Sequence, residues 1–191
     1  MDGDGSGITQ LTTSGIARGP YCAPDSQTVY FTIRARENVP GVALWSIPLS
    51  GGTPRKELES ESFGALPISR DTKSAMALFN KNLLYFIQIW DLSTHQMVRQ
   101  LPWDTSAMLQ GAFPAFSPDG KAAVVTVVSK GSNALQYEPI DGSPTHLLTE
   151  PTHEMQTGFA WSPSASKLAV LQSRRSSDVV LITDLTGKQP R

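Results

Sequence analysis

The sequence has little of what marks an enzyme, a membrane protein or a disulfide-bonded domain. Cys22 is the only cysteine among 191 residues, so no disulfide can form within the chain. No run approaches the ~20 apolar residues that a membrane helix requires. Lys and Arg number 16 against 17 Asp and Glu, which argues against the clustered cations of a nucleic-acid or anionic-membrane surface. We therefore expect no nucleic-acid partner and no direct membrane insertion.

Residues that carry chemistry are also few and scattered. Cys22 follows an aromatic at the end of a short strand, a position that favours a small buried hydrophobe over a reactive thiol. His95, His146 and His153 have no second histidine or cysteine at metal-ligand spacing. The chain has no G-x-S-x-G elbow, no phosphate-binding glycine loop and no dinucleotide fingerprint. We therefore predict no catalytic residue, no cofactor and no metal, and expect that the chain is not an enzyme.

The chain contains one sequence motif that is repeated four times. Each copy joins a short polar turn to an apolar run rich in strand-forming residues. With Pro24, Arg70, Pro118 and Pro163 as markers, successive copies lie 46, 48 and 45 residues apart. The second copy differs from the others in carrying arginine at the marker. A repeat of this period, built from short strands and turns, predicts an all-β fold made of propeller blades.

The third copy shows the predicted blade most clearly. Its inner strand carries Phe113 and Phe116, which we expect to anchor the core. Residues 117–120 (Ser-Pro-Asp-Gly) fit a type I turn, because proline suits its second position and glycine its fourth. The β-branched run 122–128 then predicts a buried second strand. A third strand over 134–140 and an outer strand over 145–149 complete four antiparallel strands.

The repeat predicts a single propeller domain over residues 1–191. We expect about four blades, at residues 13–58, 59–102, 103–150 and 151–187. Residues 8–12 match an outer strand, which leaves two alternatives open. In the first, they complete the last blade and close a four-bladed ring. In the second, they belong to a missing preceding blade, and the chain is a fragment of a six- to eight-bladed ring. Four blades is the lower limit for a propeller, so we favour the second alternative.

Five residues are candidates for contact with a partner. Arg34 and Arg36 fall in the loop between the second and third strands of the first blade, and Arg174 and Arg175 fall in the equivalent loop of the last. Equivalent loops lie on one face of a ring, so these arginines predict a weak site for an acidic partner, with a solvated loop as the alternative. Trp103 lies in a segment between blades. We expect an exposed contact residue there, or packing between blades.

The motifs resemble a known family. Residues 117–121 (Ser-Pro-Asp-Gly-Lys), the strand around Leu44-Trp45, the Gly51-Gly52 turn and residues 10–12 (Gln-Leu-Thr) resemble the TolB-type, WD-like propeller repeat of bacterial proteins. The resemblance covers nearly the whole chain. Residues 159–182 are similar to the last blade of propellers that end bacterial multidomain proteins, where a kinase or a winged-helix domain precedes the propeller.

The resemblance implies a rigid interaction platform whose repeat has no catalytic residues. The family includes a periplasmic binding protein of the Tol–Pal envelope system, and related propellers gate prolyl-oligopeptidase-type peptidases. The chain is then periplasmic if it follows the Tol protein, and otherwise cytoplasmic. We predict a non-catalytic platform that binds a protein partner. The alternative is an accessory or sensor domain of a larger bacterial enzyme or regulator, such as a kinase, a winged-helix regulator or a peptidase. A hydrolase acting through one face of the propeller is a weaker third possibility.

Overall fold

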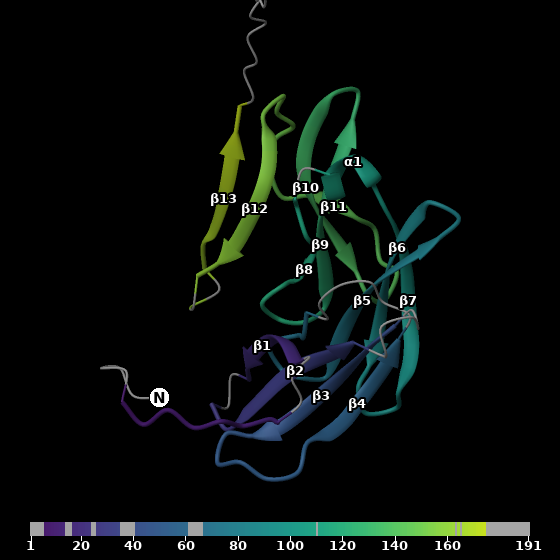
Figure 1. Cartoon of the computed structure of the whole chain (residues 1–191). Coiled ribbons are helices and arrows are strands. Elements are labelled where there is room, and N and C mark those ends of the chain that lie inside the picture. The colour runs from purple at the N-terminus through teal and green to yellow at the C-terminus, as the bar shows by residue number, and fades with distance from the viewer. Residues whose placement is uncertain are drawn as a thin grey trace, which may run out of the picture.

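The chain forms antiparallel sheets that follow one another around an arc (Figure 1). The structure is a computed structural model. It describes residues 6–13, 17–23, 26–34, 41–60, 67–109, 111–162, 164 and 166–174. Within these ranges each sheet contains strands that are consecutive in sequence, which is the arrangement of propeller blades. The predicted all-β propeller fold is therefore confirmed.

The first and third sheets each contain four strands. The first has the order β1 (Ala17–Cys22), β2 (Thr28–Arg34), β3 (Val42–Pro48) and β4 (Arg55–Ser60). The third runs from β8 (Ala115–Phe116) through β9 (Ala122–Ser129) and β10 (Ser132–Pro139) to β11 (His146–Leu147). The predicted outer strand over 145–149 thus shrinks to two residues.

The second and fourth sheets are shorter. The second contains β5 (Ser74–Lys81), β6 (Leu84–Asp91) and β7 (Gln96–Trp103). On the inner side of β5, the described residues add a single bridge from Ile68 to Ala75. The fourth contains β12 (Met155–Trp161) and β13 (Leu168–Ser173). The predicted blade ends at residues 58 and 102 both fall inside strands, because β4 and β7 continue past them.

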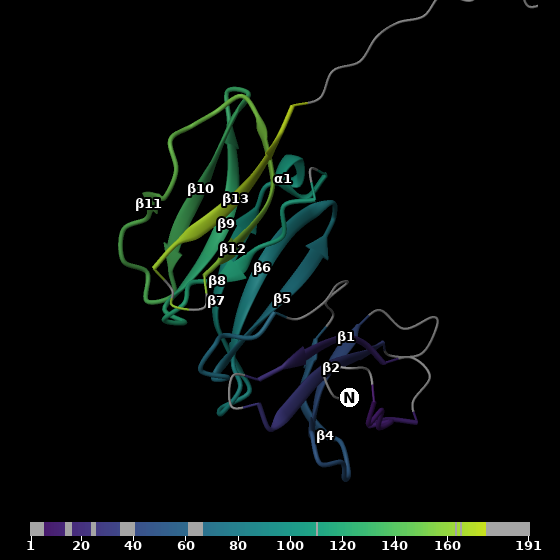
Figure 2. The ribbon, with the colours of Figure 1, turned by 90° about the vertical axis from the view of Figure 1, so that its left-hand side faces the viewer.

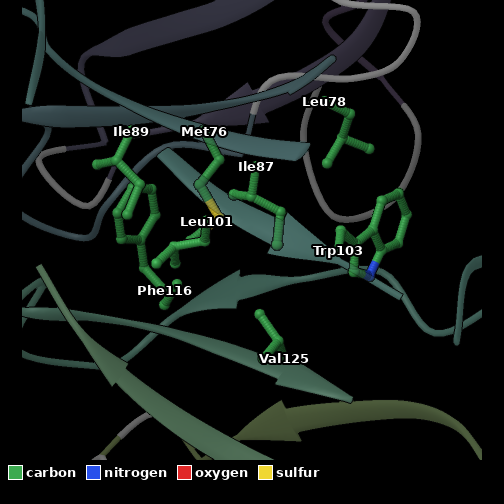
Figure 3. Close-up of a cluster of buried hydrophobic side chains, with 9 residues drawn as sticks. Met76, Leu78, Ile87, Ile89, Leu101, Trp103, Phe116 and Val125 are labelled. Atoms are coloured by element: carbon green, nitrogen blue, oxygen red, sulfur yellow. The ribbon is translucent and has the colours of Figure 1, made fainter. Parts of the chain in front are cut away.

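The largest apolar core lies between the second and third sheets (Figure 3). Met76 and Leu78 of β5 point into it, while their neighbours Ala75 and Ala77 pack against the first sheet. Successive side chains of a strand face opposite sides, so a strand covered on both faces is apolar at nearly every position. The run 75–79 is apolar for this reason. The core is completed by residues of the neighbouring strands: Ile87, Ile89, Leu101, Trp103, Phe116, Ala123 and Val125.

Of the two alternatives for Trp103, the structure shows packing between blades and not an exposed contact residue, because Trp103 ends β7 opposite Tyr85 and is only 4% exposed. The prediction for Phe113 was wrong. Phe113 does not anchor the core, since it precedes β8 and is 58% exposed. The indole of Trp103 packs edge-on against Tyr85, and Phe113 lies against its outer side. The blade register therefore places the tryptophan in the core and the phenylalanine at its rim.

A short helix, α1 (Thr105–Leu109), joins the second sheet to the third. Asp104 Oδ1 accepts a hydrogen bond from the Ser106 amide at 2.7 Å, which satisfies one of the free amides at the start of the helix. The segment after Trp103 was predicted only as a linker. Within the described ranges, no helix has the length and apolar character needed to cross a membrane.

Residues 8–12 do not form the outer strand that was predicted. Instead they lie along the first sheet, where Leu11 packs on a cluster of Val29, Phe31 and Ile47. A hollow of about 290 Å³ remains between this segment and the sheet. Figure 2 shows the first sheet at one end of the arc, and the last sheet crossing in front of the third at the other. In the last sheet, Leu171 of β13 is 63% exposed.

Two equivalent hairpin tips give a stability prediction. Asn82-Leu83 joins β5 to β6 and Lys130-Gly131 joins β9 to β10, with positive φ at all four residues. This is the type I′ geometry that favours glycine at its second position. Leu83 has φ +65° and is 81% exposed, so its side chain contributes little packing. We expect Leu83→Gly to raise the free energy of unfolding by about 0.5–1 kcal/mol, because glycine relieves the left-handed strain.

The matched variant is Gly131→Leu, which should lower stability by a similar amount or more because Gly131 has φ +78°. Urea unfolding of both variants measures the two changes in the free energy of unfolding, provided that the dependence of this free energy on urea concentration stays the same. An unchanged or lower midpoint for Leu83→Gly would contradict the strain at this tip.

Candidate functional site

The repeated turn is held by hydrogen bonds within its own sequence. In the third blade, the Gly120 amide donates to the Ser117 carbonyl at 2.9 Å, as predicted for a type I turn. Ser117 Oγ accepts a bond from the Ala122 amide at 3.0 Å and donates to Asp119 Oδ1 at 2.6 Å. The same carboxylate oxygen accepts the Lys121 amide at 3.0 Å. The turn therefore forms from the local sequence alone.

The second blade makes the same turn without proline. Ser69 Oγ donates to Asp71 Oδ1 at 2.7 Å and accepts the Ser74 amide at 2.9 Å. Asp71 Oδ1 accepts the Lys73 amide at 3.1 Å. Arg70 occupies the marker position inside this turn, and none of these bonds involves its side chain. In the last blade, Ser162 Oγ likewise accepts the Lys167 amide at 3.1 Å.

Described residues at or beside the turn in each of the four repeats line one hollow. Each repeat contributes the residue two positions before its marker, and these four residues are Cys22, Ile68, Phe116 and Trp161. They end or adjoin the inner strands β1, β8 and β12 and the Ile68 bridge. The hollow measures about 400 Å³ and is open to solvent. We call it the axial hollow, because all four blades reach it.

The walls of the axial hollow combine aromatic, apolar and polar side chains with one charge. Tyr21 is 39% exposed there, Trp161 is half-buried, and Phe116 is buried. Ser117, Pro118 and Ser162 add small polar and apolar surface. Arg70 is the only charged residue among those that line the hollow. The sequence prediction for Cys22 was wrong, because its thiol is exposed here and not buried in a core.

A second hollow of about 380 Å³ adjoins the first between the third and fourth blades. We call it the side hollow. The two share Ser117, Pro118 and Trp161, so Trp161 stands between them. Asp119 and Tyr137 line the rest of the side hollow, and Tyr137 stacks on the ring of His146 with ring centroids 4.9 Å apart. Together the hollows offer aromatic surface, with the cation of Arg70 in the axial hollow and the carboxylate of Asp119 in the side hollow.

The turn keeps Asp119 ionised. The hydrogen bond from Ser117 lowers the pKa of this carboxyl group, and the amide and charge of Lys121 lower it further. A lowered pKa in the folded state means that ionised Asp119 contributes stability above the ordinary aspartate pKa. That contribution is lost as the pH falls through the lowered value.

We expect Ser117→Ala to move the pKa of Asp119 back up toward the ordinary aspartate range. The acid-induced loss of this contribution then begins at higher pH. Carboxyl NMR titration measures the shift. Asp91 is the internal control, because its bonds from Ser93 and Thr94 lower its pKa to about 2 independently of Ser117. An unchanged pKa for Asp119 in the variant would show that the serine is not the main cause.

Of the arginines predicted as contact residues, Arg174 is the one whose side chain the structure describes, and it lines neither hollow. Arg174 is exposed directly after β13. Arg34 is the last residue of β2 and does not lie in a loop, as had been predicted. Arg36 and Arg175 lie outside the described residues. Trp103 is in the core, so truncating it tests packing and not binding.

The residues that the structure does bring together escaped the sequence analysis, although a signal was present. The position before the turn is large and apolar in three repeats, as Ile68, Phe116 and Trp161. In a strand such residues are typical of a core, so the pattern alone does not indicate a binding site. The second signal is the arginine that stands at one marker in place of proline. Among the described residues, no group of three or more metal-ligating side chains gathers anywhere.

Comparison with solved structures identifies the fold. The chain matches TolB from Acinetobacter baumannii with a TM-score of 0.60 and 21% identity over 85% of this chain and 39% of that one. It matches an oligogalacturonate lyase in complex with manganese with a TM-score of 0.61 and 16% identity, over 71% and 39% of the two chains. An acylaminoacyl peptidase from Pyrococcus horikoshii gives a TM-score of 0.54 and 14% identity, over 74% and 26%.

The chain thus has a TolB-like propeller fold and spans less than half the length of each of these proteins. No protein-family model matches the sequence. No curated protein matches it either. The structural neighbours include both a Tol protein and enzymes, so the fold by itself does not assign a function.

Proposed function

We propose that this chain is a non-catalytic binding module that holds a short segment of a protein partner in the axial hollow. The observation that carries the proposal is the convergence of all four repeats on one open, aromatic-lined hollow. Aromatic side chains and arginine dominate the energetics of protein–protein contacts. Tyr21, Trp161 and Arg70 supply these types at a single place. The continuous pair of hollows suits an extended polypeptide better than a compact metabolite.

The arrangement of possible nucleophiles supports a binding role. Ser117 Oγ donates to Asp119, and no described histidine is bonded to it. His146 stacks on Tyr137, and His153 lies in an exposed loop near the Gly131 carbonyl. An activated serine needs a base within hydrogen-bond reach of its hydroxyl. The serine here serves the turn.

Cys22 provides a direct test, because the only thiol of the chain lines the axial hollow and is exposed. Short random peptides are selected on the immobilised protein, and each selected peptide is then added during modification of Cys22 by a neutral maleimide. We expect bound peptides to slow this modification in a saturable way. Peptides that bind without protecting Cys22 would place the binding surface elsewhere and overturn the proposal.

The matched control moves the thiol away from the site. In the double variant Cys22→Ser, Val98→Cys, the thiol lies on the outer strand β7, where Val98 is 50% exposed. The same peptides should leave its modification rate unchanged. Slowing of both thiols would indicate a general effect of the peptide on the reagent or on the fold.

A second candidate is an accessory or sensor domain of a larger enzyme or regulator. It is favoured by the enzymes among the structural neighbours, of which the chain spans only a part. Reading the gene upstream of the Met1 codon tests it. An open frame that continues into an enzymatic or regulatory domain supports this candidate, and a stop codon with a ribosome site just before Met1 removes it.

A further inference from the structure

We infer that Arg70 is the specificity-determining residue of the axial hollow and binds a carboxylate of the ligand. The inference deepens the proposed function and rests on binding at that hollow. The ligand group is the carboxylate of an aspartate, a glutamate or a chain end, set beside apolar or aromatic neighbours.

The first argument is the break in the repeat. Three markers are proline, which pre-sets φ for the second position of the turn. Arg70 lacks that local preference, but the turn is kept by the hydrogen bond from Ser69 Oγ to Asp71 Oδ1 and by the Lys73 and Ser74 amides, which donate to these two side chains. The arginine is therefore not required to build the turn. Its side chain reaches the one place where all four repeats meet.

The second argument is that the guanidinium has no bonded partner among the residues that the structure describes. Arg70 is exposed and makes no hydrogen bond or ion pair with any described residue. Asp71 follows Arg70 in the same turn, and Asp119 is the equivalent aspartate of the third blade. Each carboxylate accepts hydrogen bonds from a serine hydroxyl and a backbone amide of its own turn. Among the described residues that line the axial hollow, none carries a carboxylate. A permanently charged fork of donors is thus free to bind an anion.

The third argument concerns which anion fits. Tyr21, Phe116 and Trp161 line the same hollow as Arg70, so an anion bound there lies beside aromatic side chains. A guanidinium binds carboxylate and phosphate equally well in geometry. A phosphate ester carries a charge of about −1.5 to −2, however, and is usually held by several cations. The hollow has one described cation, which matches the single charge of a carboxylate.

The test uses the peptides that were selected by binding to the immobilised wild-type protein and that then protect Cys22 from modification. We expect them to carry an acidic residue, and replacing it by its amide should weaken binding about tenfold. Arg70→Pro is the matched variant, because it restores the residue found in the other repeats and so preserves the turn. It should weaken the binding of acidic peptides about tenfold and remove their advantage over the amides.

Two further variants serve as controls. Arg70→Lys should recover part of the affinity for acidic peptides. Arg174→Gln removes an exposed cation outside the hollow and should leave that affinity unchanged.

A second arm separates this inference from the proposed function. Indole-3-propionate and its neutral amide are titrated against maleimide modification of Cys22, without any peptide. In the wild type, we expect the acid to protect Cys22 at about tenfold lower concentration than the amide. In Arg70→Pro, the acid and the amide should protect Cys22 at the same concentration. If this holds but no peptide protects Cys22, the carboxylate site stands and the polypeptide ligand is wrong. If peptides protect Cys22 with no preference for an acid or for Arg70, the proposed function stands and this inference is overturned.

Discussion

Truncation of Trp103 to alanine should lower the free energy of unfolding by about 3–5 kcal/mol. The indole is 4% exposed in the core between the second and third blades, edge-on to Tyr85 and beside Phe113. Its removal leaves a cavity that two packed sheets cannot close by moving together, because each is held by its own hydrogen-bonded register. Thermal unfolding should show a fall in midpoint on the order of 10 °C.

Two controls separate the packing of Trp103 from a general aromatic effect. Phe113→Ala removes a ring that touches the same indole but is 58% exposed, so it should cost less than about 1 kcal/mol. Trp103→Phe keeps part of the buried area and should lie between the two. If Trp103→Ala leaves the midpoint unchanged, the residue does not serve the core in the way that the structure shows.

Truncation of Trp161 to alanine should reduce the affinity of peptides that protect Cys22 by about 30-fold or more. This side chain stands between the axial hollow and the side hollow, so a ligand that spans both contacts it from two directions. A central aromatic of this kind contributes about 2 kcal/mol or more to binding. Trp161→Phe should retain much of the affinity, because it keeps an aromatic face.

Trp90 provides the comparison for this variant. It is also half-buried in a strand, but it packs against the core between the first and second blades and lines neither hollow. We expect Trp90→Ala to lower the unfolding midpoint while peptide affinity, measured below that temperature, stays unchanged. Equal loss of affinity in both variants would mean that the effect of Trp161 is one of stability and not of contact.

The fold could be predicted from the sequence because its determinants are local and repeated. The serine and aspartate of the third turn bond to amides within six residues of chain, and the following run 122–128 is rich in β-branched side chains. The same pattern recurs at a period of about one blade. A turn and a strand of this kind form whenever their own residues are present, so the pattern alone was enough to predict blades.

The site was harder to predict, because its residues come from four different blades. Cys22, Ile68, Phe116 and Trp161 are each separated by roughly one repeat, and nothing in the sequence between them brings them together. Their meeting depends on how the inner strands of successive sheets curve around the arc. A pattern search along the chain finds basic loops such as Arg174 more readily, since neighbouring charges are visible in the sequence itself.

The sequence alone determined the all-β class, the blade period and the type I turn, since each depends on residues close together in the chain. The tertiary structure decided which aromatics are buried and which are exposed. It placed Trp103 in the core and Phe113 at the rim, although both flank the same junction between blades. It also exposed Cys22 and brought Arg70 to the axial hollow. Burial and convergence depend on the packing of one sheet against the next, and that packing is set by residues a whole repeat away.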